Sequence, residues 1–305
     1  MIPLTVVIAA STAVGFGAER RFTGTAEHVS QRLMHYVLWI AMPLVTFFNI
    51  AALELGAQLG AGIAFAYLSE TAALVIAFVV GTYVLRMPRP STGALMVASS
   101  QGNTGFLGIP IVAVLLGFDE VANAVAYNVL VTAMAVVTIG FSIGAAFGTI
   151  AERPRDRLKV FFTRNPALWA ALAGFLAPDV LAPVWAVDGS RLLVLAIIPI
   201  GFFAVGVTLA GESAEQGAPF PPTLDAAVAW ALCLKLLVAP AVLLGLSTLV
   251  IEVSPTFVLE AAMASGLTNL IVAETYGLDR RLAAASILYG TLICLVVGVA
   301  AATLM

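Results

Sequence analysis

Charged residues are scarce in this sequence. Only 10% of its 305 residues are Asp, Glu, Lys or Arg, whereas 61% are hydrophobic. Soluble domains carry about a quarter charged residues, because their surface must be solvated. This composition, with a mean hydropathy of +1.06, excludes a soluble protein and places most of the chain in a lipid bilayer. The net charge of −3 gives no indication of a nucleic-acid partner.

Histidine and cysteine are also scarce, which limits the chemistry available to an enzyme. His28 and His35 are the only histidines, and their place near the start of the second apolar run excludes a haem or histidine–metal site at mid-membrane. Cys233 and Cys294 lie in apolar runs, which favours buried apolar side chains over a disulfide or a metal site. Paired Asp-rich motifs and intramembrane protease signatures are missing as well. We therefore expect no enzyme, no cofactor and no metal.

The apolar residues form ten runs, and a membrane-spanning helix needs about 20 such residues. The first run has no basic stretch before it and no small-residue cleavage site after it, which argues against a signal peptide. The sequence therefore predicts an all-α, multi-pass membrane protein. The ten predicted helices, numbered in chain order, cover residues 1–16, 33–53, 58–85, 91–117, 121–150, 166–187, 191–211, 224–251, 255–277 and 282–304.

The basic residues indicate the orientation of these helices. Of the 14 Lys and Arg residues, Arg191 is predicted in a loop on one side and Lys235 inside helix 8. The others lie after helices 1, 3, 5 and 9, and basic loops are typically cytoplasmic. This pattern predicts a protein of the cell membrane with both termini outside. The residues on the cytoplasmic side are Arg20, Arg21, Arg32, Arg86, Arg89, Arg153, Arg155, Arg157, Lys159, Arg164, Arg280 and Arg281.

The two halves of the chain resemble each other. The residues around Pro43 are similar to those around Pro199, and Gly117-Phe118-Asp119 is similar to Gly277-Leu278-Asp279. The longest cytoplasmic loop, 151–165, separates a first repeat at 1–150 from a second at 166–305. Five helices per half make the second half enter from the opposite side, so an inverted repeat is predicted, as in many secondary transporters. Coincidence between similar apolar segments is the alternative.

Helix 4 carries polar residues, glycines and a proline in the middle of its span. Gly and Pro weaken helices, and loose backbone amides are costly in hydrocarbon. We therefore expect a broken helix that lines a cavity and holds an anion at its freed N–H groups. Close helix packing through small residues is the alternative. The residues expected to bind or to form the hinge are Gln101, Gly102, Asn103, Thr104, Gly105, Gly108 and Pro110.

Helix 9 contains the corresponding polar segment, without a proline. Ser265, Gly266, Thr268 and Asn269 are the residues concerned. If both helices break and cross, Asn269 faces Asn103 near the centre of the membrane.

Two charged residues lie inside predicted spans. A charge at mid-membrane costs about 2.5–3.5 kcal/mol on insertion scales, so Lys235 is expected to point into the bundle, with snorkelling to an interface as the alternative. Glu70 is a candidate for ion coupling or for a structural pair with Lys235. Glu252, Glu260 and Glu274 lie nearer predicted helix ends and are expected at the interface. Polar packing is favoured, over lining the same cavity, for Asn128, Thr132 and Tyr289.

These residues resemble the auxin efflux carrier family, the bacterial relatives of plant PIN auxin carriers. The segment 103–110 resembles the family's helix-4 motif, and 235–240 resembles a basic residue five positions before a proline in helix 8. Glu70-Thr71 resembles the acidic residue before Thr in helix 3 of plant members. Two departures are Ala264, where many members carry proline, and Gly102, where plant members carry proline. The sequence also resembles the family's helix-9 ending, at Asn269, Ala273, Tyr276, Gly277 and Asp279.

The resemblance implies two inverted five-helix repeats with broken, crossed helices 4 and 9. Helices 1, 2, 6 and 7 then form a scaffold, and helices 3–5 and 8–10 a transport domain that moves like an elevator. Plant members move indole-3-acetate, and bacterial members are associated with malonate and malate. A homodimer through the scaffold is a further expectation, and its exposed aromatic residues are predicted to be Phe47, Phe48, Phe202 and Phe203.

We therefore predict a secondary transporter of small organic carboxylates. Asn103 and Asn269 are expected to donate hydrogen bonds to the carboxylate, with help from the amides of Thr104 and Gly105. Lys235 supplies positive charge, and Glu70 is its partner or a proton-responsive group, with the proton as a candidate coupling ion. One alternative is a sodium-coupled symporter of the bile acid:sodium type, in which Glu260 and Asn269 contribute ligands. Another is a membrane sensor that binds its ligand without moving it.

Overall fold

The computed structural model describes residues 2–53, 56–149, 166–215 and 222–304, so the predicted linker at 151–165 lies outside the described residues. Within these ranges all regular elements are helices. Six of them are long and apolar enough to cross a membrane, which confirms a multi-pass helical protein. The six are Thr25–Ala51, Ala57–Val84, Phe118–Phe147, Val184–Thr208, Ala226–Leu249 and Arg280–Ala301.

Three of the predicted spans are divided into shorter helices. Residues 91–117 and 255–277 are each interrupted near the middle, and 166–187 is cut by a turn. In the first half the α-helices are α1 (Ile2–Arg21), α2 (Thr25–Tyr36), α3 (Met42–Ala51), α4 (Ala57–Val79), α5 (Arg89–Ser100), α6 (Ile109–Leu115), α7 (Val121–Ala126) and α8 (Phe141–Phe147). In the second half they are α10 (Pro166–Leu176), α11 (Val184–Glu215), α12 (Ala226–Cys233), α13 (Ala239–Leu249), α14 (Pro255–Ala261), α15 (Leu267–Tyr276) and α16 (Arg280–Leu304).

Short π-helical segments join several of these helices. Three of them, η1 (Val37–Ala41), η3 (Thr104–Gly108) and η8 (Leu234–Val238), each end two residues before a proline. A proline has no N–H to donate, so a longer hydrogen-bond spacing just before it accommodates the missing donor. Such π segments are frequent at functional sites, and here η3 and η8 contain residues that the sequence singles out.

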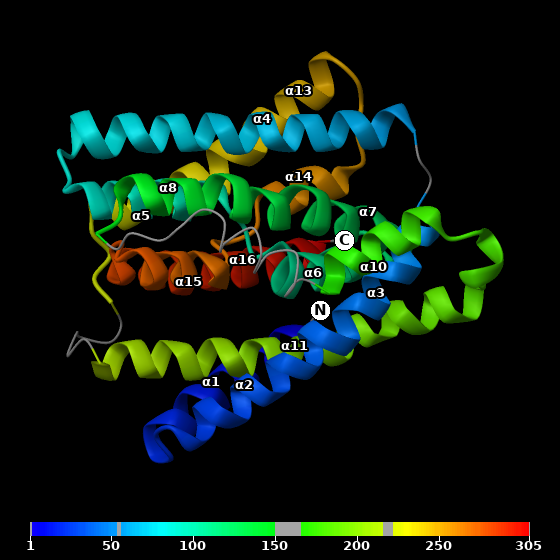
Figure 1. Ribbon diagram of the computed structural model, residues 1–305, viewed down its shortest axis with the longest axis horizontal. Coiled ribbons are helices and arrows are strands. Elements are labelled where there is room, and N and C mark those ends of the chain that lie inside the picture. The colour runs from blue at the N-terminus through cyan, green and yellow to red at the C-terminus, as the bar shows by residue number, and fades with distance from the viewer. Residues whose placement is uncertain (1, 54–55, 150–165, 216–221, 305) are drawn as a thin grey trace.

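The helices run along the long axis of the molecule (Figure 1). The connections α1–α2, α4–α5 and α15–α16 lie at one end, and α3–α4, α10–α11 and α13–α14 lie at the other. We call the first the arginine end, because it carries Arg20, Arg21, Arg86, Arg89, Arg280 and Arg281.

The turn between α10 and α11 lies earlier than predicted. The α10 helix ends at Leu176 and α11 begins at Val184, whereas the sequence pattern places this turn near residue 189. Apart from Asp179, the true turn consists of apolar residues and two prolines, so the hydropathy pattern does not reveal it. As a consequence Arg191 lies inside α11 rather than in a loop.

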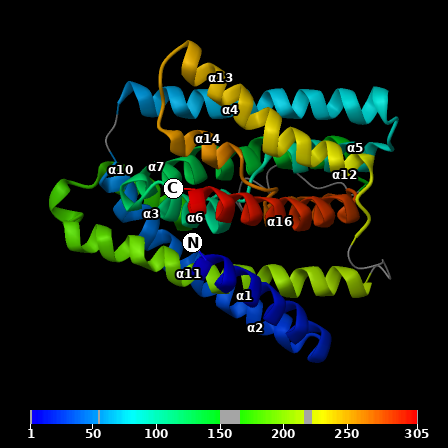
Figure 2. The same ribbon diagram turned by 180° about the vertical axis from the view of Figure 1, so that it is seen from behind.

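The helices pack in two groups. The first group consists of α1, α2, α3, α10 and α11, and the second of α4–α8 and α12–α16. Figures 1 and 2 show α1, α2 and α11 together on one side of the molecule, with α4 and α13 on the other. Phe202 is buried within α11 at 1% exposure, which corrects its expected role as an exposed aromatic residue.

The first group contains a close approach of two backbones. A Cβ atom on Gly15 of α1 would lie 2.1 Å from the carbonyl oxygen of Phe203, and one on Gly206 of α11 would lie 2.1 Å from that of Thr12. Only glycine fits at both positions, so α1 and α11 touch main chain to main chain. Small residues are the usual means of such contact between membrane helices.

Candidate functional site

The predicted break in helix 4 is present. The α5 helix ends at Ser100, and helical structure resumes at Thr104. Between them Asn103 caps the second half-helix, since its Oδ1 accepts a hydrogen bond from the Phe106 N–H at 3.2 Å. Asn is among the preferred residues at this position because its side chain replaces a missing helical acceptor. Pro110 follows at the start of α6, directly after the π segment η3, whose longer hydrogen-bond spacing accommodates the missing N–H.

The corresponding helix in the second half also breaks, although it has no proline there. The α14 helix ends at Ala261, and α15 begins at Leu267. The Ser265 hydroxyl donates to the carbonyl of Ala98 at 2.5 Å, and the Asn269 amide donates to that of Gln101 at 3.0 Å. Bonds to the other half of the chain therefore hold this break open.

The two interruptions cross as a short antiparallel bridge between Gly102 and Ser265. The Asn103 N–H donates to the Ala264 carbonyl at 2.7 Å, and the Gly266 N–H donates to the Gln101 carbonyl at 3.2 Å. A Cβ atom on Gly266 would lie 2.9 Å from the Gly102 oxygen. Glycine is thus required where the two segments pass each other. Each interruption supplies hydrogen-bond partners for backbone groups of the other.

A cavity of about 350 Å³ opens at this crossing. The half-helices that begin at Thr104 and Leu267 both present their N-termini to it. Their first N–H groups have no intrahelical acceptor and carry partial positive charge. The residues that line this cavity are Leu38, Trp39, Met42, Gly102, Asn103, Thr104, Gly105, Phe106, Asn128, Val129, Thr132, Ala133, Val136, Phe141, Pro166, Ala167, Gly266, Leu267 and Thr268.

Asn103 lines this cavity and has a donor left over. Its Oδ1 is used by the helix cap, whereas its Nδ2 is buried with no hydrogen-bond partner. Beside it, the Thr104 hydroxyl lies 2.8 Å from Asn128 Oδ1 and 3.0 Å from the Thr132 hydroxyl. A buried donor without a partner is unfavourable, so the site is suited to a ligand that brings an acceptor.

The structure separates the predicted site residues into two sets. Asn103, Thr104, Gly105 and Thr268 line the cavity, together with Gly102 and Gly266. Gln101, Ser265 and Asn269 are buried behind it and bond to backbone carbonyls, Gln101 through Nε2 to Ala135 at 3.2 Å. Asn128 and Thr132 also line the cavity, although the sequence favours polar packing for both. The Tyr289 hydroxyl donates instead to the carbonyl of Pro222.

Lys235 lies behind the crossing and is 1% exposed, so it points into the bundle as expected. Its Nζ donates to the carbonyls of Ser100 at 3.4 Å and Ala261 at 3.1 Å. Glu70 is equally buried, but neither of its oxygens has a hydrogen-bond partner. Among the described side chains no carboxylate lies within 4.0 Å of Lys235, so the two residues do not form a direct ion pair.

Glu260 was expected at the membrane interface and is instead fully buried. It lies in the last turn of α14, and a Cβ atom on Gly108 would lie 1.9 Å from its Oε2. A continuous helix over 255–277 places residue 260 near a helix end, but the break after Ala261 places it next to the crossing. In the sequence, the nearby polar residues 265–269 are the signal that Glu260 lies close to an interruption of the helix.

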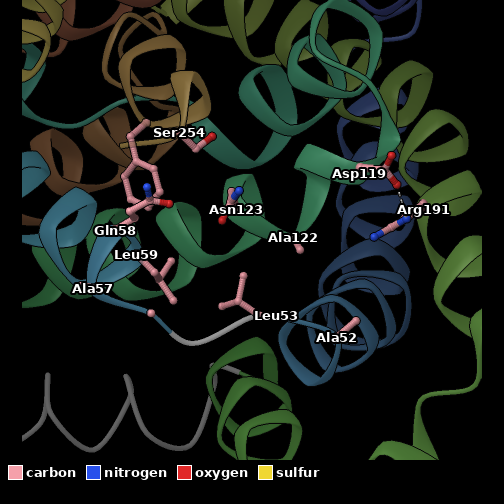
Figure 3. A pocket seen from close by; sticks show the side chains of 12 residues that line it. Ala52, Leu53, Ala57, Gln58, Leu59, Asp119, Ala122, Asn123, Arg191 and Ser254 are labelled. Carbon is pink, nitrogen blue, oxygen red and sulfur yellow. Dashed lines mark hydrogen bonds and ion pairs between the residues drawn. The ribbon is translucent and has the colours of Figure 1, made fainter. Parts of the chain in front are cut away.

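A second cavity, of about 550 Å³, lies at the end of the molecule opposite the arginine end. Residues of both helix groups line it. Figure 3 shows Arg191 of α11 next to Asp119 at one side of this cavity, with Nη1 3.4 Å from Oδ1. Arg191 also donates to Asn49 Oδ1 at 3.3 Å. The contact between Arg191 and Asp119 joins the first group to the connection between α6 and α7.

A bundle of apolar helices with two crossed interruptions and a cavity at their crossing is the arrangement found in membrane transporters. The family model described as membrane transport protein matches residues 1–299 of this chain. The chain belongs to this family. The resemblance to auxin efflux carriers is thereby confirmed, and this membrane transport protein is a transporter rather than an enzyme.

Two archaeal proteins are similar to this membrane transport protein. An uncharacterized transporter of Methanocaldococcus jannaschii is 25% identical over 314 residues, which cover 97% of each chain. Another uncharacterized transporter, from Methanothermobacter thermautotrophicus, is 29% identical over 214 residues, which cover 67% of this chain and 65% of that protein.

Proposed function

We propose that this membrane transport protein is a secondary transporter of small organic carboxylates, which bind in the cavity at the crossing. The observation that carries the proposal is the unpartnered Nδ2 of Asn103 beside the N-termini of two half-helices. A carboxylate accepts several hydrogen bonds, and helix N-termini favour anions. Thr104, Gly105 and Thr268 supply the further donors around the carboxylate.

The apolar walls set the class of anion. Trp39, Phe106 and Phe141 line the same cavity and accept the carbon skeleton, while the carboxylate faces the crossing. In this proposal Gln101, Ser265 and Asn269 hold the crossing together, and Asn103 is the principal side-chain donor. A volume of about 350 Å³ lies at the small end of the range for ligand pockets.

The transport mechanism that we propose is an elevator movement of the second helix group against the first. Both halves of the chain contribute one broken helix and meet at the crossing, which supports ten spans in two inverted repeats. The crossing cavity lies between the groups, because Leu38, Trp39 and Met42 come from the first and most other lining residues from the second. The arginine end is assigned to the cytoplasm, which leaves both termini outside.

Flux measurements on the purified protein in liposomes test this function. We expect saturable uptake of malonate, malate or indole-3-acetate in sodium-free buffer, and no uptake by empty liposomes. Solid-supported-membrane currents and radiolabelled uptake together detect electrogenic and electroneutral transport. Binding of these anions without any flux in either assay would identify a ligand sensor and contradict the proposal.

A further inference from the structure

The ammonium group of Lys235 lies where two half-helices end. Ser100 is the last residue of α5 and Ala261 the last residue of α14, and Lys235 Nζ donates to the carbonyls of both. The C-terminus of a helix carries roughly half a negative charge. In secondary transporters such half-helix ends and unwound carbonyls are the groups that coordinate a coupling cation.

Two buried carboxyl groups lie on helices next to Lys235. Glu70 comes from α4 and Glu260 from α14, and none of their oxygens has a hydrogen-bond partner. Both interact electrostatically with Lys235. A buried charge that is left uncompensated is strongly unfavourable, so the ammonium of Lys235 depends on the carbonyl oxygens of Ser100 and Ala261 that surround it.

The space around the ammonium is closely filled. A Cβ atom on Gly102 would lie 3.1 Å from both Cε and Nζ of Lys235, so the crossing itself forms one wall. Lys235 enters from η8, a π segment of the second helix group. A fixed cation therefore sits against the same residue, Gly102, that lines the anion cavity on its other face.

We propose that these oxygens form a cation site and that the ammonium of Lys235 occupies it as a covalently attached substitute for a coupling cation. Removal of the lysine side chain then opens a site for an alkali cation, with Ser100 O and Ala261 O as ligands and with room for the Glu260 carboxyl, which lies more than 4.0 Å from the ammonium, to turn toward the cation. This inference deepens the proposed transport function, because it assigns the protein to sodium-independent transport. It argues against the sodium-coupled symporter.

Thermal unfolding of the purified full-length protein tests the site without any substrate. The wild type, Lys235→Ala, Lys235→Met and the double variant Lys235→Ala/Glu260→Gln are compared in NaCl, LiCl and KCl against choline chloride at constant ionic strength. We expect the wild-type Tm to be independent of the cation. The Tm of Lys235→Ala is expected to rise saturably with the alkali cation, by about 2–4 °C at a cation concentration ten times the Kd.

The other variants distinguish the effect of the lysine charge from the effect of the space that its side chain fills. Lys235→Met fills the site without a charge, so its Tm is expected to ignore the salt. Lys235→Ala/Glu260→Gln lacks one ligand charge and needs a higher cation concentration for the same rise. Folding of Lys235→Ala in an alkali salt alone also supports the site.

Three results overturn the inference. The first is a saturable sodium response of the wild type, in Tm or in uptake. The second is a folded Lys235→Ala variant that ignores all three alkali cations. The third is a Lys235→Ala variant that folds in no salt while the double variant folds and ignores the cations. None of these results affects the anion site, whose test is loss of uptake on substitution of Asn103.

Discussion

The backbone N–H of Asn103 donates a 2.7 Å hydrogen bond to the carbonyl of Ala264, and so joins the interruption of one helix to that of another in the opposite half of the chain. The same residue caps its own half-helix through Oδ1 and leaves Nδ2 without a partner. Main chain and side chain therefore have different tasks at this position. Substitutions can separate them.

Asn103→Asp is expected to keep the fold and to lose anion binding. Asp caps helices as well as Asn does, but it has no amide donor and brings a negative charge to the cavity. A hydrogen bond to a charged group contributes about 1.5–3 kcal/mol, so affinity for the anion should fall roughly 10- to 150-fold. Equilibrium binding and uptake in liposomes measure this.

Asn103→Ala should likewise abolish transport while the protein remains folded. Asn123→Ala is the matched control, because Asn123 lies near the opposite end and bonds to Glu120. Wild-type affinity and uptake in both Asn103 variants would remove Asn103 from the site.

Asn269→Ala is expected to lower stability and to leave affinity for the anion nearly unchanged. Its amide bonds to the Gln101 carbonyl and it lies behind the cavity rather than on its surface. Hydrogen bonds between membrane helices contribute about 0.6 kcal/mol on average and up to about 1.7. Thermal unfolding should show the loss. A fall in affinity as large as that of Asn103→Asp would instead make Asn269 a direct ligand.

Gly108→Ala is expected to destabilise the protein because its methyl group would collide with Glu260 Oε2, 1.9 Å away. Overpacking of this kind costs about 1–3 kcal/mol. The double variant Gly108→Ala/Glu260→Ala removes the collision, so its destabilisation should be smaller than the sum of the two single effects. Strictly additive values would show that the two residues do not touch.

Cross-linking residues 119 and 191 is expected to stop transport. Asp119 and Arg191 join the two helix groups, and the proposed elevator movement must separate them. The variant Asp119→Cys/Arg191→Cys is made in a background with Cys233→Ala and Cys294→Ala, and is then cross-linked and reduced again. Uptake should disappear and return.

The control for this experiment is Asp188→Cys/Arg191→Cys. Asp188 and Arg191 lie in one helix with their charges 3.6 Å apart, so a link between them joins no moving parts. Undiminished uptake by the fully cross-linked 119–191 variant would contradict the elevator movement.

Asp225 provides a pH test at the arginine end. Partial burial raises its pKa, but hydrogen bonds from the Val228 N–H and from Arg281 outweigh this, so the pKa lies below its ordinary value of 3.8. The stability that its ionised form contributes is therefore complete at neutral pH and is lost as the pH falls through this lowered pKa. Asp225→Asn keeps the helix cap but loses the ion pair.

Because both partners are partly exposed, we expect a loss of only about 0.2–1 kcal/mol at pH 7. The difference in Tm between the wild type and Asp225→Asn should begin to shrink as the pH falls below about 4 and should vanish below the lowered pKa of Asp225. A difference that persists at lower pH would assign the effect to the cap instead.

The features that the sequence predicted are those that local chemistry determines. The break at 101–103 follows from polar residues and glycines in one short segment, and the buried Lys235 follows from a charge inside an apolar run. The break before Leu267 is less visible, because hydrogen bonds from Ser265 and Asn269 to the other half maintain it without a proline. Only the folded arrangement supplies those partners.

Two positions were missed for the same physical reason. Glu260 lies near the start of an apolar run, and the polar residues 265–269 indicate a break without showing that the helix already ends at Ala261 and leaves this side chain at mid-structure. The turn before Val184 consists mostly of apolar residues and prolines, with Asp179 as its one charged residue, whereas the segment 188–190, which resembles a turn, lies inside helix α11. Hydropathy reports preference for lipid, not the position of a bend.

The close contact between α1 and α11 has a consequence for biosynthesis. Gly15 and Gly206 touch the backbone of the partner helix, yet the partner of α1 leaves the ribosome long after it. At about 5–20 residues per second, the first helix waits on the order of ten to forty seconds in the membrane before its binding surface is complete. During that time its glycine face is open to lipids and to other nascent helices.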